Sequence, residues 1–121
     1  MDAPLVAGGF VVAEWTAPGG DPRPQAPPHL HRDDDEAWYV LSGRLAFRLG
    51  DDEVEAGPGE AVCARRGVAH TFWNPGTEAA RYLLVMTPRI NALIEAIHRT
   101  NDRSPERMRA LFEAHASELV S

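Results

Sequence analysis

The sequence predicts an all-β domain, a sandwich or barrel of antiparallel strands, followed by a short α-helical tail. Between residues 8 and 87, strand-length runs rich in Val, Leu and aromatic residues are separated by Gly, Pro and Asp turn signals. Short strands at this spacing are typical of sandwiches and barrels. From residue 88 onward, apolar residues recur at helical spacing instead. We therefore predict one domain with two parts, a barrel over residues 1–88 and a helical extension over residues 89–121 that packs on it.

The predicted strands lie within residues 8–16, 36–43, 44–50, 52–57, 61–67, 70–74 and 80–87. The segment 20–28, GDPRPQAPP, holds too many prolines for a paired strand and should approach the barrel in an extended form. In the tail, Ser104, Pro105 and Glu106 form a favourable helix start, so two helices with a break around Thr100–Arg103 are expected. The apolar positions of the tail are Ile90, Leu93, Ile94 and Ile97, then Met108, Leu111, Phe112 and the later His115 and Leu119.

Two placements of the tail remain open. Its helices either pack on the outer sheet or a dimer interface, or they cover a barrel mouth with Met108, Leu111 and Phe112.

Composition excludes several classes of protein. The length of 121 residues suits one domain, and the net charge of −6 argues against binding to nucleic acid. Cys63 is the only cysteine, the first residues resemble no secretory signal, and no apolar run approaches the roughly 20 residues of a membrane span. We expect a cytoplasmic protein with no membrane partner.

Three histidines and one carboxylate stand out as candidate metal ligands. On a strand, the side chains of His29 and His31 point to one face, Glu36 follows after a short turn, and His70 comes from a later strand. Such donors suit Fe, Mn, Ni, Zn or Cu better than Mg or Ca. Paired histidines near acidic residues also occur on ordinary surfaces, so this pattern alone leaves the question open. His98 and His115 lie in the helical tail, where a structural role is expected.

Two longer motifs resemble those of the cupin superfamily. Residues 29–43 match H-x-H-x(3,4)-E-x(6)-G, and residues 59–74 match G-x(5)-P-x-G-x(2)-H-x(3)-N with Arg65 in place of the proline. A second departure is Arg23, which stands where the family usually has a glycine. The resemblance implies a jelly-roll barrel, the double-stranded β-helix, that binds one divalent metal through His29, His31, Glu36 and His70.

The six-residue gap to Gly43 favours Glu36 over Asp35 as the acidic ligand. Gly43, Gly59 and Gly67 stand where strands turn corners, which favours residues that accept positive φ. For Arg65 we expect a surface arginine paired with Asp33–Asp35, with substrate contact as the alternative.

The run from Trp15 to Gly43 is similar to small bacterial cupins of the quercetin-dioxygenase-like group. This implies a metal-dependent dioxygenase or related oxidoreductase, in which Glu36 serves as a catalytic base and the substrate is a small organic molecule. A redox-neutral isomerase or cyclase and a non-catalytic binding or sensing module are the alternatives. Three aromatic residues are expected to line the substrate pocket: Trp38, Phe47 and Phe72.

A homodimer is also expected. Tyr39 and Leu41 point away from the metal face, and the tail carries a further apolar stripe. A barrel of this size has limited outer surface on which to bury both within one chain.

Overall fold

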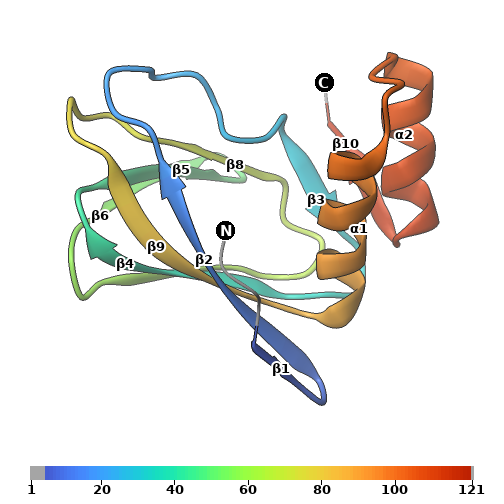
Figure 1. Cartoon of the computed structure of the whole chain (residues 1–121), viewed down its shortest axis with the longest axis horizontal. Coiled ribbons are helices and arrows are strands. Elements are labelled where there is room, and N and C mark those ends of the chain that lie inside the picture. The colour runs from blue at the N-terminus through green and yellow to red at the C-terminus, as the bar shows by residue number, and fades with distance from the viewer. Residues whose placement is uncertain (1–4, 121) are drawn as a thin grey trace.

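The computed structural model describes residues 5–120, in which two five-stranded antiparallel sheets face each other and two helices stand at one end (Figure 1). The first four residues of the predicted barrel and the last residue of the predicted tail lie outside the described part of the chain. The first sheet runs in the order β1 (Leu5–Ala7), β2 (Phe10–Ala17), β9 (Ala80–Met86), β4 (Glu36–Ser42) and β7 (Ala61–Ala64). The second runs β10 (Ser117–Leu119), β3 (His29–His31), β8 (His70–Trp73), β5 (Leu45–Leu49) and β6 (Asp52–Ala56).

All seven predicted strands are present, and period-2 patterning explains their orientation. In β4, for example, Glu36, Trp38 and Val40 are buried, whereas Tyr39 between them is exposed. The segment over residues 20–28 is irregular, as its prolines predict, and leads into β3. The alternation therefore directs one side of each central strand into the space between the sheets.

The core between the sheets is aromatic. The ring of Trp38 lies 5.1 Å from that of Phe47 and 5.4 Å from that of Phe72, and Phe72 meets Tyr82 at 5.6 Å. Contacts of this kind between rings stabilise the core beyond simple burial of area. These packed rings form the part of the core next to the candidate site, where Trp38 contacts His70.

One of the predicted glycine corners leaves no room for a side chain. Gly43 has φ 76°, and a Cβ there would lie 2.8 Å from the carbonyl oxygen of Ala79. Both the backbone angle and the close approach of β9 require glycine at the turn between β4 and β5. Gly59 and Gly67 also have positive φ, of 82° and 81°.

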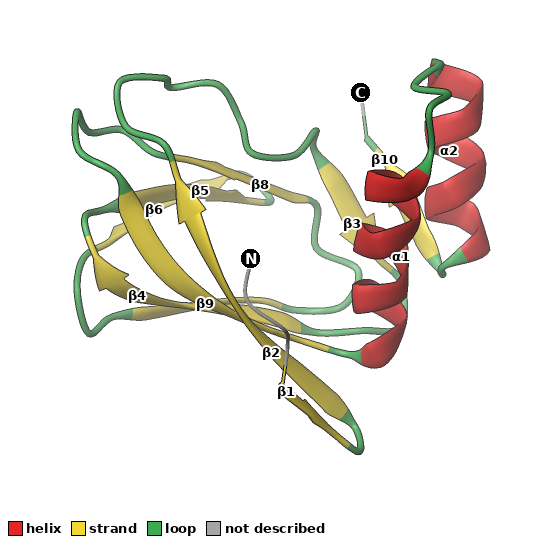
Figure 2. Cartoon of the chain, viewed as in Figure 1, coloured by secondary structure: helices red, strands yellow, loops and turns green. Residues whose placement is uncertain are grey.

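The tail forms α1 (Pro88–Arg99) and α2 (Pro105–Ala114), shown in red in Figure 2. The hydroxyl of Thr87 caps α1 by accepting from the backbone N–H of Ile90, and that of Ser104 caps α2 by accepting from the N–H of Arg107. Two helices with a break between them and a start at Ser104 are thus confirmed. None of the helices in residues 5–120 is long and apolar enough to cross a membrane.

The end of the tail differs from the prediction. Residues 117–119 form β10, which pairs with β3, so Leu119 is in a strand and His115 only caps α2. Ala116, at φ 53°, turns the chain from helix to strand. The helical spacing of Leu119 was misleading because pairing with the edge of β3, far away in sequence, decides the conformation of this segment.

The helices lie against the open end of the barrel beside β3, and not on the outside of either sheet (Figure 1). Leu93 of α1 packs with Leu111 and Phe112 of α2 in a second, smaller core. The guanidinium of Arg89 in α1 also holds the buried carboxylate of Asp34, with 2.8 Å between Nε and Oδ2, and so anchors the helix to the loop between β3 and β4. The helices therefore lie at the barrel mouth, where Met108 and Phe112 line a cavity and Leu111, also expected there, does not. Packing at a dimer interface stays a prediction.

Candidate metal centre

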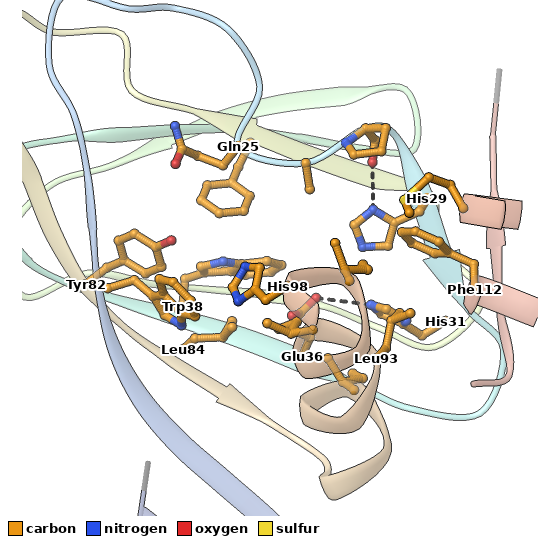
Figure 3. Close-up of a pocket in the computed structure, with 18 of the residues that line it drawn as sticks. Gln25, His29, His31, Glu36, Trp38, Tyr82, Leu84, Leu93, His98 and Phe112 are labelled. Carbon is orange, nitrogen blue, oxygen red and sulfur yellow. Dashed lines mark hydrogen bonds and ion pairs between the residues drawn. The ribbon is translucent and has the colours of Figure 1, made fainter. Parts of the chain in front are cut away.

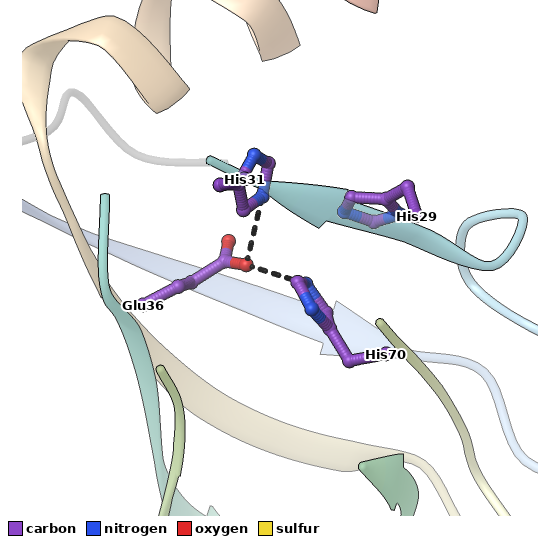
Figure 4. Close-up of side chains that lie close together, drawn as sticks. All are labelled: His29, His31, Glu36 and His70. Carbon is purple, nitrogen blue, oxygen red and sulfur yellow. Dashed lines mark hydrogen bonds and ion pairs between the residues drawn. The ribbon is translucent and has the colours of Figure 1, made fainter. Parts of the chain in front are cut away.

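Four buried side chains from three strands converge at one end of the barrel (Figure 4). His29 and His31 lie on β3, Glu36 begins β4, and His70 begins β8, where it is the direct cross-strand partner of His29. Each residue is less than 10% exposed, and each offers a ligand atom within 4.8 Å of the others. The structure thus brings together the four residues that the motifs single out.

The hydrogen bonds of the three histidines determine which ring nitrogens face inward. The Nδ1–H of His29 donates to the carbonyl oxygen of Pro27 at 2.7 Å, and that of His70 donates to the carbonyl oxygen of Val68 at 3.0 Å. The Nδ1 atom of His31 lies 2.7 Å from the hydroxyl oxygen of Ser117. With all three Nδ1 atoms engaged in this way, the Nε2 atoms are left to carry lone pairs towards the centre.

The charge state of the site suits a cation. Burial of His29, together with the nearby His70, lowers the pKa of its imidazole to about 4, so the ring is neutral near pH 7. Burial alone would raise the pKa of Glu36, but hydrogen bonds and charge interactions with His31 and His70 outweigh it and lower this pKa to about 2. An ionised carboxylate beside a neutral imidazole is the form in which both groups ligate metals.

Two contacts indicate that a metal ion fits between these side chains. Oε1 of Glu36 lies 3.1 Å from Nε2 of His70 and 3.4 Å from Nε2 of His31, and both side chains are buried. A metal ion between the carboxylate and these two nitrogens would take the place of their direct contacts, because all three atoms can act as ligands. A set of three imidazoles and one carboxylate is accepted by Fe, Mn, Ni, Zn and Cu.

A cavity of about 450 Å³ adjoins three of the four ligands and extends towards the helices (Figure 3). His29, His31 and Glu36 are part of its wall, which is otherwise mainly apolar and aromatic. The barrel contributes Trp15, Trp38, Phe72, Tyr82 and Leu84, and the tail contributes Ile90, Leu93, Ile94, Ile97, Met108 and Phe112. The size and character of this cavity suit a small organic ligand.

Residues 17–86 match the family model described as the cupin domain. The chain belongs to the cupin family. An uncharacterized protein of Streptomyces coelicolor is 37% identical to this cupin over 54 residues, which is 45% of this chain and 50% of that protein. The chain thus spans about half the length of the curated relative it matches.

Solved structures agree with the family assignment. A protein of Silicibacter pomeroyi described as a sugar phosphate isomerase from a cupin superfamily is 27% identical, with a TM-score of 0.56 over 65% of this cupin and 50% of that chain. The protein TT1209 of Thermus thermophilus is 25% identical, with a TM-score of 0.60 over 71% and 82% of the two chains. The jelly-roll fold expected from the sequence is therefore confirmed.

The cavity contains two of the three aromatic residues predicted for the pocket of this cupin. Trp38 and Phe72 line it, but Phe47 does not, because it lies behind them in the core and is fully buried. Placement of Phe47 in the pocket was wrong, since strand phase distinguishes inside from outside but not the depth at which a side chain lies.

The ion pairing of the arginines near the site also differs from the prediction. Arg66, and not Arg65, pairs with Asp35, through both its backbone N–H at 2.8 Å and its guanidinium. Asp35 therefore points to the surface, while Glu36 occupies the cluster. Arg65 is exposed and is not among the residues that line the cavity.

The two tail histidines lie outside the four-residue cluster. His115 caps α2 through a 2.7 Å contact between its Nδ1–H and the carbonyl oxygen of Leu111. His98 is exposed on α1 and packs its ring 5.5 Å from that of Trp15 at the cavity wall. His98 therefore lies at the cavity wall, although it is not part of the four-residue cluster.

Several wall residues escaped the sequence-based prediction. Tyr82 could have been found, because it shares the buried face of β9 with Leu84. Met108 and Phe112 were anticipated at the barrel mouth as one of two placements, but the wall residues of α1 were not, because their positions depend on how the helices dock onto the barrel.

Proposed function

We propose that this cupin binds one divalent transition metal through His29, His31, Glu36 and His70 and acts as a metal-dependent enzyme on a small organic molecule. The dioxygenase or related oxidoreductase class is our first choice. The observation that carries the proposal is the position of a mainly apolar cavity directly against the four-residue cluster. Metals of the expected kind accept five or six ligands, so four protein ligands leave room for a substrate oxygen.

The metal would act as a Lewis acid and, if redox-active, as a site for electron transfer. The protein's own residues orient and desolvate the substrate. Trp38 and Phe72 provide flat apolar surfaces beside Glu36 and His70, and the helices of the tail limit access of water. A planar substrate that presents an enol or phenol oxygen to the cluster fits these walls.

Glu36 is the proposed catalytic base. Its carboxylate lies in the cavity wall and, as a metal ligand, would have to leave the metal to accept the proton that an enol or phenol releases. Its contacts with His31 and His70 hold its pKa low, so its basicity rises when these contacts loosen.

A redox-neutral isomerase is the second candidate. It is favoured by the Silicibacter pomeroyi protein described as a sugar phosphate isomerase, and by His98 and Arg103, which line the outer part of the cavity. A sugar phosphate carries several hydroxyl groups and a dianion, however, and most of the wall offers them no hydrogen-bond partner. The apolar wall therefore favours the first candidate.

The test compares oxygen uptake by protein loaded separately with Fe, Mn, Ni, Cu or Zn, on a panel of flavonols and diketones. We expect uptake with a redox-active metal and none with Zn or with the variant His70→Ala. Isomerisation of sugar phosphates with Zn and without oxygen uptake would favour the second candidate. Quenching of tryptophan fluorescence by a ligand that no metal form converts would identify a binding or sensing module and contradict both enzymes.

A further inference from the structure

Ser117 connects the C-terminal strand to the metal centre. Its side chain is fully buried, and its Oγ lies 2.7 Å from Nδ1 of His31. The same hydroxyl donates its proton to the carbonyl oxygen of His115 at 3.0 Å. Since its only proton is used there, Oγ accepts at His31, and the Nδ1 atom of that ring must carry a proton.

This arrangement differs from that of the other two histidines. His29 and His70 donate to carbonyl oxygens of Pro27 and Val68, each only two residues earlier in the barrel. The acceptor for His31 is instead a side chain 86 residues away, on the tail. Within residues 5–120, the orientation of one ring of the cluster thus depends on a segment outside the two barrel motifs.

Backbone pairing holds Ser117 in place. It is the cross-strand partner of His31 in the β10–β3 ladder, and Leu119 is the partner of His29. On either side of the ladder, the N–H of Arg32 donates to the carbonyl of Ala116 and the N–H of Val120 donates to the carbonyl of Pro28. A short strand held at both ends positions a hydroxyl well enough to fix one ring.

We propose that Ser117 is a positioning residue for the metal ligand His31: its hydroxyl fixes the tautomer with Nδ1 protonated and aims Nε2 at the metal. The inference rests on the proposed metal site and goes beyond it, because it makes the C-terminal strand a functional part of that site. Partners of this kind that orient a ligating histidine typically change metal affinity about 10- to 100-fold when they are removed.

The experiment measures Co²⁺ affinity by competition with a chelator, together with the visible absorption spectrum of the Co²⁺ form. For Ser117→Ala we expect affinity to fall about 10- to 100-fold and the spectrum to change. Ser117→Thr, which keeps the hydroxyl, should restore a large part of both. Two controls weaken the tail without touching His31: Ser104→Ala removes the cap of α2, and Leu119→Ala removes a side chain that packs on the helix pair.

The outcomes distinguish a failure of the Ser117 proposal from a failure of the metal site on which it rests. If wild-type protein binds no Co²⁺, the metal site fails. If wild type binds and folded Ser117→Ala binds equally with an unchanged spectrum, Ser117 has only a structural role and the proposal is overturned. Losses of Co²⁺ affinity in Ser104→Ala and Leu119→Ala as large as the loss in Ser117→Ala would overturn the proposal too.

If Ser117→Ala does not fold, ¹⁵N-resolved NMR of the wild-type Zn²⁺ form decides. A protonated Nδ1 on His31 that exchanges slowly with solvent supports the proposal, and a protonated Nε2 contradicts it.

Discussion

In each imidazole of the candidate metal centre, one ring nitrogen makes a hydrogen bond within the protein and the other points to the centre of the cluster. The partners of these hydrogen bonds are two backbone carbonyls and the hydroxyl of Ser117. Such partners fix the tautomer and orientation of a ligand before the metal arrives, which lowers the entropy lost on binding. Glu36 then supplies a negative charge to the cluster.

The buried imidazole of His29 predicts that metal-free protein loses stability in acid. Its ordinary pKa is 6.5, and burial lowers it to about 4 in the folded chain, so below pH 6.5 the unfolded chain binds a proton that the folded chain does not. Stability is thus full above pH 6.5 and declines as pH falls towards 4, by up to about 3 kcal/mol from this group. Glu36 acts with the same sign between pH 4.5 and about 2.

Urea denaturation of chelator-treated protein at several pH values measures this effect. The variant His29→Gln should lose much of the slope between pH 6.5 and 4, whereas His98→Gln, altered at an exposed residue, should keep it. A slope in His29→Gln equal to that of wild type would contradict the assignment to His29.

At the scale of secondary-structure elements, the tail both completes the fold and covers the cavity. Phe112 packs its ring 5.3 Å from that of His29, while Leu111 beside it packs against Leu93 without lining the cavity. Of these two neighbours on α2, Phe112 therefore lines the cavity as well as packing in the smaller core, whereas Leu111 only packs in that core.

Removal of the chain after Thr100 should therefore have two effects. It exposes the partners of Leu111 and Phe112, whose burial contributes roughly 1.5–3 kcal/mol each, and it opens the cavity mouth. We expect a much lower melting temperature and faster binding of azide to the Co²⁺ form. Unchanged melting and unchanged azide kinetics would mean that the tail has neither role.

A matched pair of variants resolves the two effects. Phe112→Ala and Leu111→Ala should each cost about 2–5 kcal/mol of stability. Only Phe112→Ala removes part of the cavity wall, so only this variant should accelerate azide binding. Equal acceleration in both variants would contradict a covering role for Phe112.

Elements whose structure depends on local pattern could be predicted from the sequence, and elements that depend on distant contacts could not. Alternation predicted the barrel strands, and strand phase put His29 and His31 on one face. Glu36 lies on another strand, so the full ligand set depended on the resemblance to the cupin motifs. Strand β10 has only three residues and exists through its pairing with β3. The cavity wall contributed by the helices likewise depends on long-range docking.

At the scale of the whole molecule, the homodimer stays a prediction, and part of the apolar surface on which it was based is used within the chain. The apolar stripe of the tail is used within the chain, since Ile90 and Leu93 are buried and Ile94 and Ile97 line the cavity. The large hydrophobic side chains that remain exposed within residues 5–120 are Leu5, Phe10, Tyr39 and Val54. Two of these lie on the β1–β2 hairpin, which projects from the barrel (Figure 1).

Light scattering at micromolar concentration tests the dimer. We expect a mass about twice the 13.3 kDa of one chain, and a shift towards one chain for Phe10→Ser. Val54→Ser, on the other sheet, serves as the comparison. A wild-type mass of about 13.3 kDa would refute the dimer.

The central claim is that one divalent transition metal is held by His29, His31, Glu36 and His70, and metal content per chain tests it most directly. Elemental analysis of wild type, His31→Ala and His98→Ala, each saturated with Co²⁺ or Zn²⁺ and then passed through a desalting column at pH 7.5, compares a ligand variant with a tail histidine outside the cluster. We predict about one metal ion per chain for wild type and for His98→Ala, and far less for His31→Ala. Equal metal content in His31→Ala and wild type, or no metal in wild type, would contradict the account.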